Sequence, residues 1–293
     1  MKIAYISYDK QVNYTAGLTQ DEEAVLLNFL IEKGLDIEKV IWNDPGIDWS
    51  VYPVAILKSP WDYHEKLDDF NAWLDRLEGL GVSLMNPYHI IRWNSDKHYL
   101  QEVADAGFQV IRSSFLEKGE KKTLPHYFEE LGNNKLIIKP CVSAGAKDTM
   151  ILTPENAQEI ENTLLSATRY DALIIQPFMD EVLDGEISFI FLGGVFSHSV
   201  VKVPRSGEFR VQHFFGGTIQ PYTPAENVLK SAASFVDRFA KDCLYARVDG
   251  ILVDGEFQLM ELELIEPYLF LDSHPEGYHN YYQALQKQIA VSF

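Results

Sequence analysis

Four charged residues interrupt an apolar stretch near the end of the chain. Arg247 and Asp249 come before the pair Asp254-Gly255, and Glu261 and Glu263 come after it. An Asp-Gly pair between two apolar runs is typical of the tight turn of a β-hairpin. Three carboxylates on a buried hairpin cost too much free energy unless a cation neutralises them. Hard divalent cations prefer oxygen ligands, and magnesium is the one that commonly works with phosphate groups, so this stretch predicts a magnesium site.

The length of the loop decides whether the two charged pairs face the same side of the hairpin. Side chains alternate along a strand, so each pair shares one face of its own strand. A two-residue turn, which pairs Val253 with Glu256, would place the two pairs on opposite faces. A three-residue loop with Gly255 in the left-handed conformation pairs Leu252 with Glu256 and places them on one face. A shared metal site therefore predicts the three-residue loop.

In that register Arg247 lies opposite Glu261, and Asp249 lies one step further along the same face. Two plainer interpretations stay open. The hairpin can be exposed with a solvated acidic face, because runs of charge are often simply surface. Alternatively, Arg247 can serve only as the ion-pair partner of Glu261.

The composition limits the class of protein. With 293 residues, 46% hydrophobic and 23% charged, the chain has the composition of a globular protein of two or three domains. Its formal net charge of −18 argues against a protein that binds nucleic-acid backbones, although a nucleotide needs only a few local cations. Cys141 and Cys243 form neither a disulfide framework nor a metal cluster, which fits the cytoplasm. Residues 1–8 are expected to form a first strand and not a signal peptide, and no apolar run reaches membrane-spanning length, so we expect no membrane partner.

The first third of the chain alternates strands with helices. Strands are expected over 2–8, 37–42, 54–58 and 82–85, with one helix behind a capping box at 19–22 and another over 67–77. This alternation predicts a mainly parallel sheet in an α/β domain, residues 1–92.

The third strand leads directly into a short aromatic segment, Ser59-Pro-Trp-Asp-Tyr63. Ligands of open α/β sheets bind beyond the carboxyl ends of strands, so Trp61, Asp62 and Tyr63 are candidates for a substrate pocket. A surface turn whose aromatic residues pack on the next helix is an equally good interpretation.

The middle of the chain predicts an α+β domain, residues 93–178. A helix over 94–106, capped by Asn94 or Ser95, would carry Lys97 in its first turn, where the helix dipole disfavours a cation. A strand over 135–140 ends at Lys139 and runs into a loop of small residues, 141–148, that can bring backbone N–H groups close to an anion. Further elements are expected at 149–153 (strand), 154–167 (helix) and 171–177 (strand).

The last part of the chain, residues 179–293, predicts a second α+β domain. Strands are expected over 186–192 and 195–203, followed by a polar loop, a helix over 224–242, the charged hairpin and a final helix from about residue 278. Taken together, two isolated lysines, a small-residue loop and three carboxylates point to a nucleotide whose phosphates meet lysine and magnesium. Neither a P-loop nor a dinucleotide-binding glycine motif is present.

This ordered set resembles the ATP-grasp superfamily over nearly the whole chain, and within it the glutathione-synthetase-like and protein-glutamate-ligase-like group. Each motif alone is weak, but their order and spacing together are specific. The early Trp-Asp-Tyr and the late Glu-Leu-Glu-Leu-Ile-Glu-Pro resemble the subgroup that includes the cyclo-ligase closing the cycloserine ring. The matching segments are Lys97, Lys139 with 140–146, 175–179, Gly185-Glu186, 207–210 with Gly216-Gly217, 247–249 and 261–263.

The resemblance implies an ATP-grasp fold with ATP between the middle and last domains. It implies phosphate contacts from Lys97 and Lys139, a mobile lid over the phosphates, an adenine site, a carboxylate for the ribose, and two magnesium ions. Where many members have asparagine, this chain has Glu263, whose extra charge should retune metal binding. The remaining implied residues are Ser143, Ala144, Gly145 and Ala146 (lid), Gln176, Phe178 and Met179 (adenine), Glu186 (ribose), and Asp249, Glu261 and Glu263 (magnesium).

The implied reaction is the joining of a carboxylate to an amine. A substrate carboxylate attacks the γ-phosphate of ATP, and an amine then displaces phosphate from the acyl phosphate. Arg210 and Arg247 would stabilise the oxyanion and Lys202 would assist at the γ-phosphate, although Lys202 is equally well explained as a solvated loop charge. The substrates are expected to be small and amino-acid-like, in one molecule or two, and a homodimer is allowed. A small-molecule phosphotransferase and a non-catalytic ATP-binding regulatory protein are the alternatives.

Overall fold

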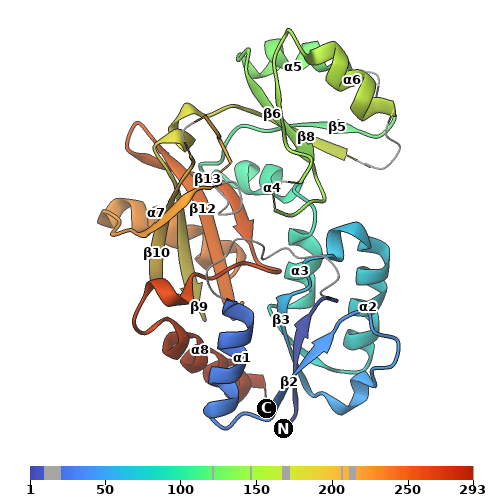
Figure 1. The fold of residues 1–293 in the computed structure, drawn as a ribbon, viewed down its shortest axis with the longest axis vertical. Coiled ribbons are helices and arrows are strands. Elements are labelled where there is room, and N and C mark those ends of the chain that lie inside the picture. Colours follow the sequence, from blue (N-terminus) through green and yellow to red (C-terminus); the bar gives the residue numbers. More distant parts are fainter. Residues whose placement is uncertain are drawn as a thin grey trace.

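The computed structural model describes residues 1–9, 21–120, 122–145, 147–166, 172–205, 207–210 and 216–292. Within these residues the strands form three sheets, which Figure 1 shows at the lower right, at the top and at the left. The expected combination of a parallel first sheet with α+β structure in the rest of the chain is confirmed. None of the helices in this described part has the length and hydropathy needed to cross a bilayer.

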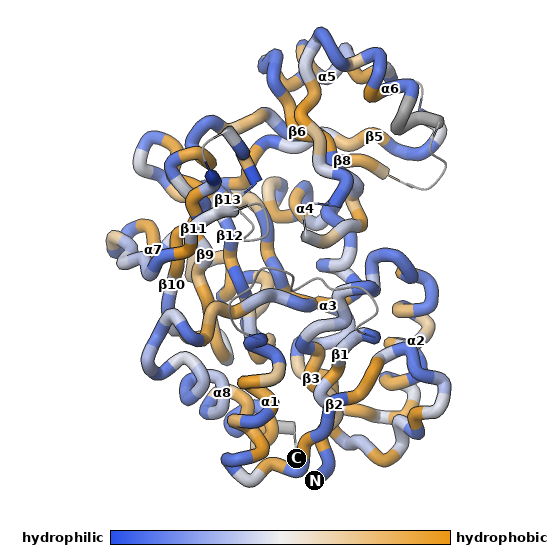
Figure 2. Tube along the Cα trace, viewed as in Figure 1, coloured by the Kyte–Doolittle hydropathy of each residue, from blue (hydrophilic) through white to orange (hydrophobic). Residues whose placement is uncertain are grey.

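The first sheet is parallel, with the strand order β2-β1-β3-β4. β1 and β3 are buried along their whole length, as expected for parallel strands covered by helices on both faces. Figure 2 shows the hydrophobic character of these strands. The elements are β1 (Ile3–Ser7), α1 (Glu22–Glu32), β2 (Ile37–Ile41), β3 (Val54–Ser59), α2 (Leu67–Gly79), β4 (Ser83–Met85) and α3 (Tyr88–Asn94), with short 3-10 turns at Trp49–Val51 and Tyr63–Glu65.

The start of α1 differs from the capping box expected at 19–22. Thr19 lies outside the described residues. Asp21 is the residue that caps the helix, because its carboxylate accepts a hydrogen bond from the N–H of Ala24 at 3.2 Å. Glu22 is consequently free to take part in a buried contact elsewhere.

The second sheet is antiparallel, with the order β5-β8-β6-β7. Its residues alternate between buried and partly buried positions in β6, which is typical of a sheet with one covered face. The elements of this region are α4 (Tyr99–Asp105), β5 (Ser114–Glu117), α5 (Leu124–Leu131), β6 (Leu136–Pro140), β7 (Met150–Leu152), α6 (Ala157–Ser166) and β8 (Ala172–Pro177).

The continuous helix expected over 94–106 is wrong. Asn94 is the last residue of α3, and α4 begins only at Tyr99. The Asn94 side chain donates to the carbonyl of Leu262 at 2.9 Å and accepts from the N–H of Leu264 at 3.0 Å. These tertiary hydrogen bonds use the side chain that was expected to cap the helix. Lys97 therefore lies between two helices, outside any first turn.

The third sheet is antiparallel, with the order β11-β10-β9-β12-β13. β9 and the first part of β12 are fully buried at its centre, and α7 packs against β12 and β13. Figure 1 shows α8 beside α1, where the last helix meets the first domain. The elements are β9 (Glu186–Leu192), β10 (Val195–Val203), β11 (Thr218–Pro221), α7 (Glu226–Phe239), β12 (Tyr245–Val253), β13 (Glu256–Glu263) and α8 (Gly277–Ser292), with 3-10 turns at Asp180–Leu183 and Leu271–Ser273.

The loop of the charged hairpin has two residues, so the three-residue loop predicted above is wrong. Val253 pairs with Glu256. Asp254 and Gly255 both have positive φ, +52° and +83°, which is the backbone of a type I′ turn. The left-handed conformation expected for Gly255 is confirmed.

A β-bulge further along the hairpin restores the arrangement that the loop alone would have lost. Gly250 of β12 pairs with Leu259, but Asp249, the residue just before Gly250, pairs with Glu261. Met260 is therefore an extra residue of β13 with no partner in β12. Arg247 consequently lies opposite Glu263, where the sequence analysis expected it opposite Glu261. The one-residue insertion brings all four charged side chains to the same face.

Gly250 is required where the bulge forms. A Cβ atom at this position would lie 2.2 Å from the carbonyl oxygen of Gln258 and 2.5 Å from the ring of Phe257. Any side chain would therefore push the two strands apart, and only glycine allows this close approach of backbone to backbone.

Candidate active site

A cavity of about 570 Å³ opens between the three sheets. Every residue that the resemblance assigns to the site and that the structure describes lines it, from Lys97 in the linker between α3 and α4 to Glu263 at the end of β13. Ala146 lies outside the described residues. Trp61 and Tyr63 also line the cavity, as one of the two interpretations of that segment expected.

Asp62, the third residue of the aromatic segment, is not among the cavity-lining residues. Its carboxylate accepts a hydrogen bond from the indole N–H of Trp42 at 2.7 Å and pairs with Lys66 at 2.8 Å. Asp62 therefore holds the segment in place through Trp42 and Lys66, while its two aromatic neighbours line the cavity.

Asp249 lies at the centre of the charged face, between two cations. Arg247 donates to it from Nε and Nη2 at 3.0 and 2.8 Å, and Lys202 Nζ lies 3.3 Å away. Ser188, which the sequence analysis missed, donates to it at 2.6 Å from the neighbouring strand. Burial raises the pKa of Asp249, but the charges of Arg247 and Lys202 outweigh burial and lower it to about 2. Asp249 is therefore an anion at neutral pH.

Glu261 and Glu263 flank Asp249 and are more accessible, with 31% and 29% of their side chains exposed. Glu261 lies 3.3 Å from Lys97, and Glu263 is paired with Arg247. Burial raises the pKa of Glu263 to about 7, with repulsion from Asp249 and Glu261 adding to the effect. The positive charge of Arg247 lowers the pKa of Glu263 but does not outweigh these effects. Glu263 therefore has too little positive charge nearby.

These residues fit a divalent metal ion. The three carboxylates offer only oxygen ligands, which is the donor set that Mg²⁺ prefers. The raised pKa of Glu263 marks a place where added positive charge would be favourable. Glu261 and Glu263 are the more accessible of the three carboxylates, so a metal ion in the cavity reaches them more readily than it reaches Asp249.

Lys139 faces the same cavity and has no ion-pair or hydrogen-bond partner for its ammonium group among the described residues. Burial lowers its pKa, and the carboxylate of Glu261 partly opposes this effect. An unpaired lysine that is half-buried in a cavity is stabilised by an anion, and phosphate is the usual one. Lys97 differs, because it donates to the backbone oxygen of Ser143 at 2.8 Å and thereby tethers the small-residue loop.

The far end of the cavity is an apolar slot. Phe178 and Met179, predicted to lie at adenine, line it, and the Phe209 ring lies 5.9 Å from that of Phe178. The N–H of Phe178 is already donated to Lys135 O at 2.9 Å, so it is not available to a ligand. Four other apolar residues of the slot were not predicted from the sequence, because each has the pattern of an ordinary core residue: Ile111, Ile137, Val182 and Met260.

Gln176, Glu186 and Arg210 have protein partners in the structure. Gln176 donates to the hydroxyl of Ser113 at 2.9 Å, and Glu186 is paired with Lys202. Arg210 forms two hydrogen bonds to Glu208, at 3.0 and 2.7 Å. Lys202 has 7% of its side chain exposed, so its interpretation as a solvated loop charge is wrong.

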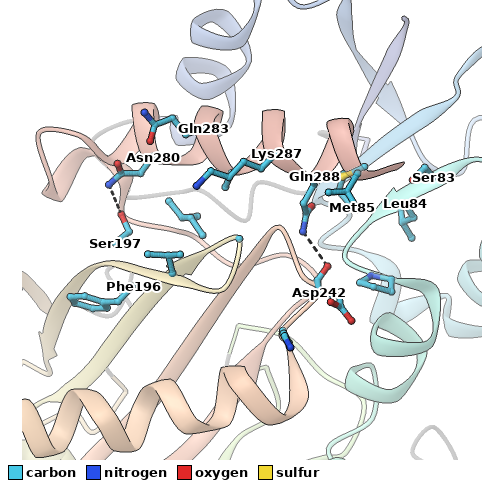
Figure 3. Close-up of a pocket in the computed structure, with 17 residues that line it drawn as sticks. Ser83, Leu84, Met85, Phe196, Ser197, Asp242, Asn280, Gln283, Lys287 and Gln288 are labelled. Carbon is cyan, nitrogen blue, oxygen red and sulfur yellow. Dashed lines mark hydrogen bonds between the residues drawn. The ribbon is translucent and has the colours of Figure 1, made fainter. Parts of the chain in front are cut away.

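A second cavity of about 580 Å³ lies beside α8. Figure 3 shows its lining, with Asn280 bonded to Ser197 and Gln288 bonded to the backbone of Asp242. None of the predicted site residues in the described part of the chain lines it. The candidate active site is therefore the first cavity.

Residues 104–268 match the family model of the prokaryotic glutathione synthetase ATP-grasp domain. The chain belongs to the ATP-grasp family. Residues 3–86 match the model of the N-terminal domain of D-cycloserine synthetase DcsG. The predicted resemblance is thereby confirmed, as are the ATP-grasp fold and the class of ATP-dependent ligase.

Individual relatives cover nearly all of this ATP-grasp chain. The cycloserine biosynthesis protein DcsG of Streptomyces lavendulae is 25% identical over 273 residues, which are 87% of this chain and 90% of that protein. The crystal structure of D-cycloserine synthetase DcsG has a TM-score of 0.84 at 24% identity, covering 98% of this chain and 99% of that one. D-alanine–D-alanine ligase from Bacillus anthracis in complex with ATP has a TM-score of 0.67 at 16% identity, covering 100% and 98%.

Proposed function

We propose that this protein is a magnesium-dependent carboxylate–amine ligase that forms an amide bond in a small amino-acid-like substrate through an acyl phosphate. The observation that carries the proposal is the opposition, across one cavity, of the unpaired Lys139 to the three carboxylates of the hairpin. A cavity with this arrangement can neutralise a polyphosphate from both sides. Three domains, residues 1–92, 93–178 and 179–293, are part of the proposal and are supported by the three sheets.

The proposed nucleotide site runs the length of the cavity. Adenine enters the apolar slot beside Phe178 and Met179, with Gln176 at its edge, and Glu186 takes the ribose hydroxyls. Lys139 and Lys97 contact the phosphates. The loop 143–146 covers them, and the bond from Lys97 to the Ser143 carbonyl links that loop to the phosphate position.

Two magnesium ions are proposed at Asp249, Glu261 and Glu263. Bound there, magnesium would neutralise the phosphates and hold them in line for transfer. Lys202, already between Glu186 and Asp249, would add a positive charge beside the γ-phosphate.

The proposed reaction has two steps. A carboxylate oxygen of the substrate bonds to the γ-phosphorus while the bond to the β–γ bridging oxygen breaks, and ADP leaves. An amine nitrogen then bonds to the acyl carbon, the carbon–oxygen bond to phosphate breaks, and the amine proton passes to phosphate or solvent. Arg247 and Arg210 are the proposed donors to the oxyanion of the tetrahedral intermediate.

The similarity to proteins named for cycloserine synthesis supports an intramolecular version, in which one molecule supplies both carboxylate and amine. The size of the cavity also favours a small substrate, because ATP would take up most of its volume. The homodimer and the cytoplasmic location stay predictions.

A phosphate-release screen with amino acids and small amines, with the mass of each product determined, tests the proposal. The expected result is an amide together with ADP and inorganic phosphate, dependent on magnesium. A stable phosphorylated acceptor would instead identify a phosphotransferase. ATP binding without turnover of any compound would identify a regulatory protein.

A further inference from the structure

The charged side chains that line the active-site cavity are nearly all paired with one another or with a neighbour. Among the described residues, two exceptions stand out: Lys139, near the end of β6, and Glu266, just after β13. The pairs are Lys97 with Glu261, Lys202 with Glu186 and Asp249, Arg247 with Asp249 and Glu263, Lys147 with Glu65, and Arg210 with Glu208.

Glu266 lies beyond the end of β13, three residues after Glu263. Burial raises its pKa well above the ordinary value, and repulsion from Glu263 adds to the effect. An unpaired carboxylate that faces a cavity is stabilised by a ligand that brings positive charge. The proposed nucleotide is an anion, so it does not meet this need.

Two aromatic residues lie next to Glu266. The indole N–H of Trp61 donates to the backbone oxygen of Glu266 at 2.9 Å. Tyr63 has a pKa that burial raises well above its ordinary value, and the carboxylate of Glu266 is the charged group that adds most to this effect. Both rings line the same cavity as Glu266. A carboxylate beside aromatic rings is a combination that favours an ammonium group.

The backbone that carries Glu266 is held in place by the first domain. Lys58 donates to the carbonyl oxygen of Pro267 at 2.9 Å, and Glu22 accepts from the N–H of Leu269, also at 2.9 Å. The segment that follows Glu266 is therefore fixed by the first domain, while no bond to the Glu266 side chain is found among the described residues. A protein carboxylate that is carried on a fixed backbone and left unpaired is preorganised for binding a ligand.

We infer that Glu266, together with Trp61 and Tyr63, binds an ammonium group of the substrate that does not react. The inference rests on the proposed function and names its substrate class, a zwitterionic amino acid. The amine that attacks an acyl phosphate must be uncharged, because a protonated nitrogen has no free electron pair. A carboxylate that stabilises the protonated form therefore suits a second nitrogen, which serves for recognition only.

Glu266→Gln, compared with wild type, tests this subsite. The variant keeps the shape and the acceptor oxygen and removes only the charge. We expect the KM for the amino-acid substrate found in the screen to rise by about 10- to 100-fold, the effect of losing one charge-assisted hydrogen bond. The KM for ATP and the magnesium concentration for half-maximal rate should stay within about twofold. The matched control is Glu256→Gln, an exposed acid on the same hairpin, which should change none of these values.

Two further measurements make the result decisive. N-acetylation of the recognised amine should weaken binding to wild type and have little effect on Glu266→Gln. The thermal midpoint of the variant should not fall, because the removed charge had no protein partner. An unchanged substrate KM would overturn the inference, and so would a shift in magnesium dependence, which would make Glu266 a metal ligand.

The inference can fail separately from the proposed function. If no compound in the screen is turned over, calorimetry with D- and L-serine, D- and L-alanine and their N-acetyl derivatives, in the presence of a non-hydrolysable ATP analogue, measures the subsite directly. Weaker binding of the free amino acids to Glu266→Gln than to wild type would support it. Equal binding to both proteins, or no binding to either, would overturn it.

Discussion

Two clusters of buried charge in the described part of the chain differ in their surroundings: one lines the active-site cavity and the other does not. In the first domain, Lys58 and Glu22, each with no more than 2% of the side chain exposed, form an ion pair at 3.0 Å. Glu22 also accepts hydrogen bonds from the backbone of Leu269 and Leu271 at 2.9 and 3.0 Å. On the hairpin, Asp249 and its cations line the active-site cavity beside Glu261 and Glu263.

The comparison shows that buried charge alone does not identify a functional site. Every oxygen of Glu22 is used by the protein, and neither it nor Lys58 is among the residues that line the cavity. The charges of the hairpin cluster are instead not balanced by the protein. The pKa of Glu263 is raised, and Lys139, which lines the same cavity, has no partner among the described residues. The first cluster fixes the segment that follows the hairpin, and the second has charge available for a ligand.

The largest effect is expected in the first cluster. Lys58→Met should lower the free energy of unfolding by about 3–5 kcal/mol, because Glu22 would be left as an unpaired buried anion. Adding Glu22→Gln should recover part of this loss. Urea denaturation of the two variants measures both values. A single variant as stable as wild type would show that the pair is not a structural one.

Lys139→Ala should lower activity and leave stability nearly unchanged, which is the opposite of Lys58→Met. We expect kcat/KM for ATP to fall by about 10²-fold, as for a lost electrostatic contact to the transferring phosphate. Stability should stay within about 1 kcal/mol, because the ammonium has no protein partner among the described residues. Lys230→Ala, on a side chain 74% exposed, is the control for a general effect of charge. Equal losses of activity in both variants would remove Lys139 from the site.

The bulge links the hairpin backbone to the geometry of the charged cluster, and it allows a smaller test. Gly250→Ala should cost about 1–3 kcal/mol, the usual range for forcing extra atoms into a packed region, and should also lower turnover. Gly255→Ala should cost about 1–2 kcal/mol through its positive φ, with turnover unchanged. Denaturation and activity measured side by side separate the two. Full activity in a stable Gly250→Ala protein would show that the bulge does not set the site.

The hairpin shows what the sequence could reveal and what it could not. The four charged residues were correctly expected on one face, because separating them would leave carboxylates without a shared cation. The predicted three-residue loop was wrong, because the Asp-Gly pair forms its preferred two-residue turn. The signal for the bulge was present in the sequence as Gly250, a glycine in the interior of a strand, which often marks such an irregularity.

Other parts of the site depend on contacts between residues far apart in the chain. The break between α3 and α4 follows from the hydrogen bonds of Asn94 to the end of the hairpin, about 170 residues away. The pairing of Glu22 with Lys58 joins a helix start to a strand end, and each residue reads as ordinary in its own context. The alternation of strands and helices, in contrast, is a local pattern, and it predicted the parallel first sheet correctly.

The most direct test of the central claim is magnesium-dependent phosphate release by Asp249→Asn and Glu261→Gln, measured beside Glu256→Gln. The first two variants each remove one carboxylate charge from the cavity, and the third removes one from the exposed end of the same hairpin. We predict a fall of at least about 10²-fold in the first two, with folding retained, and no change in the third. Wild-type rates and wild-type magnesium dependence in both Asp249→Asn and Glu261→Gln would contradict the account.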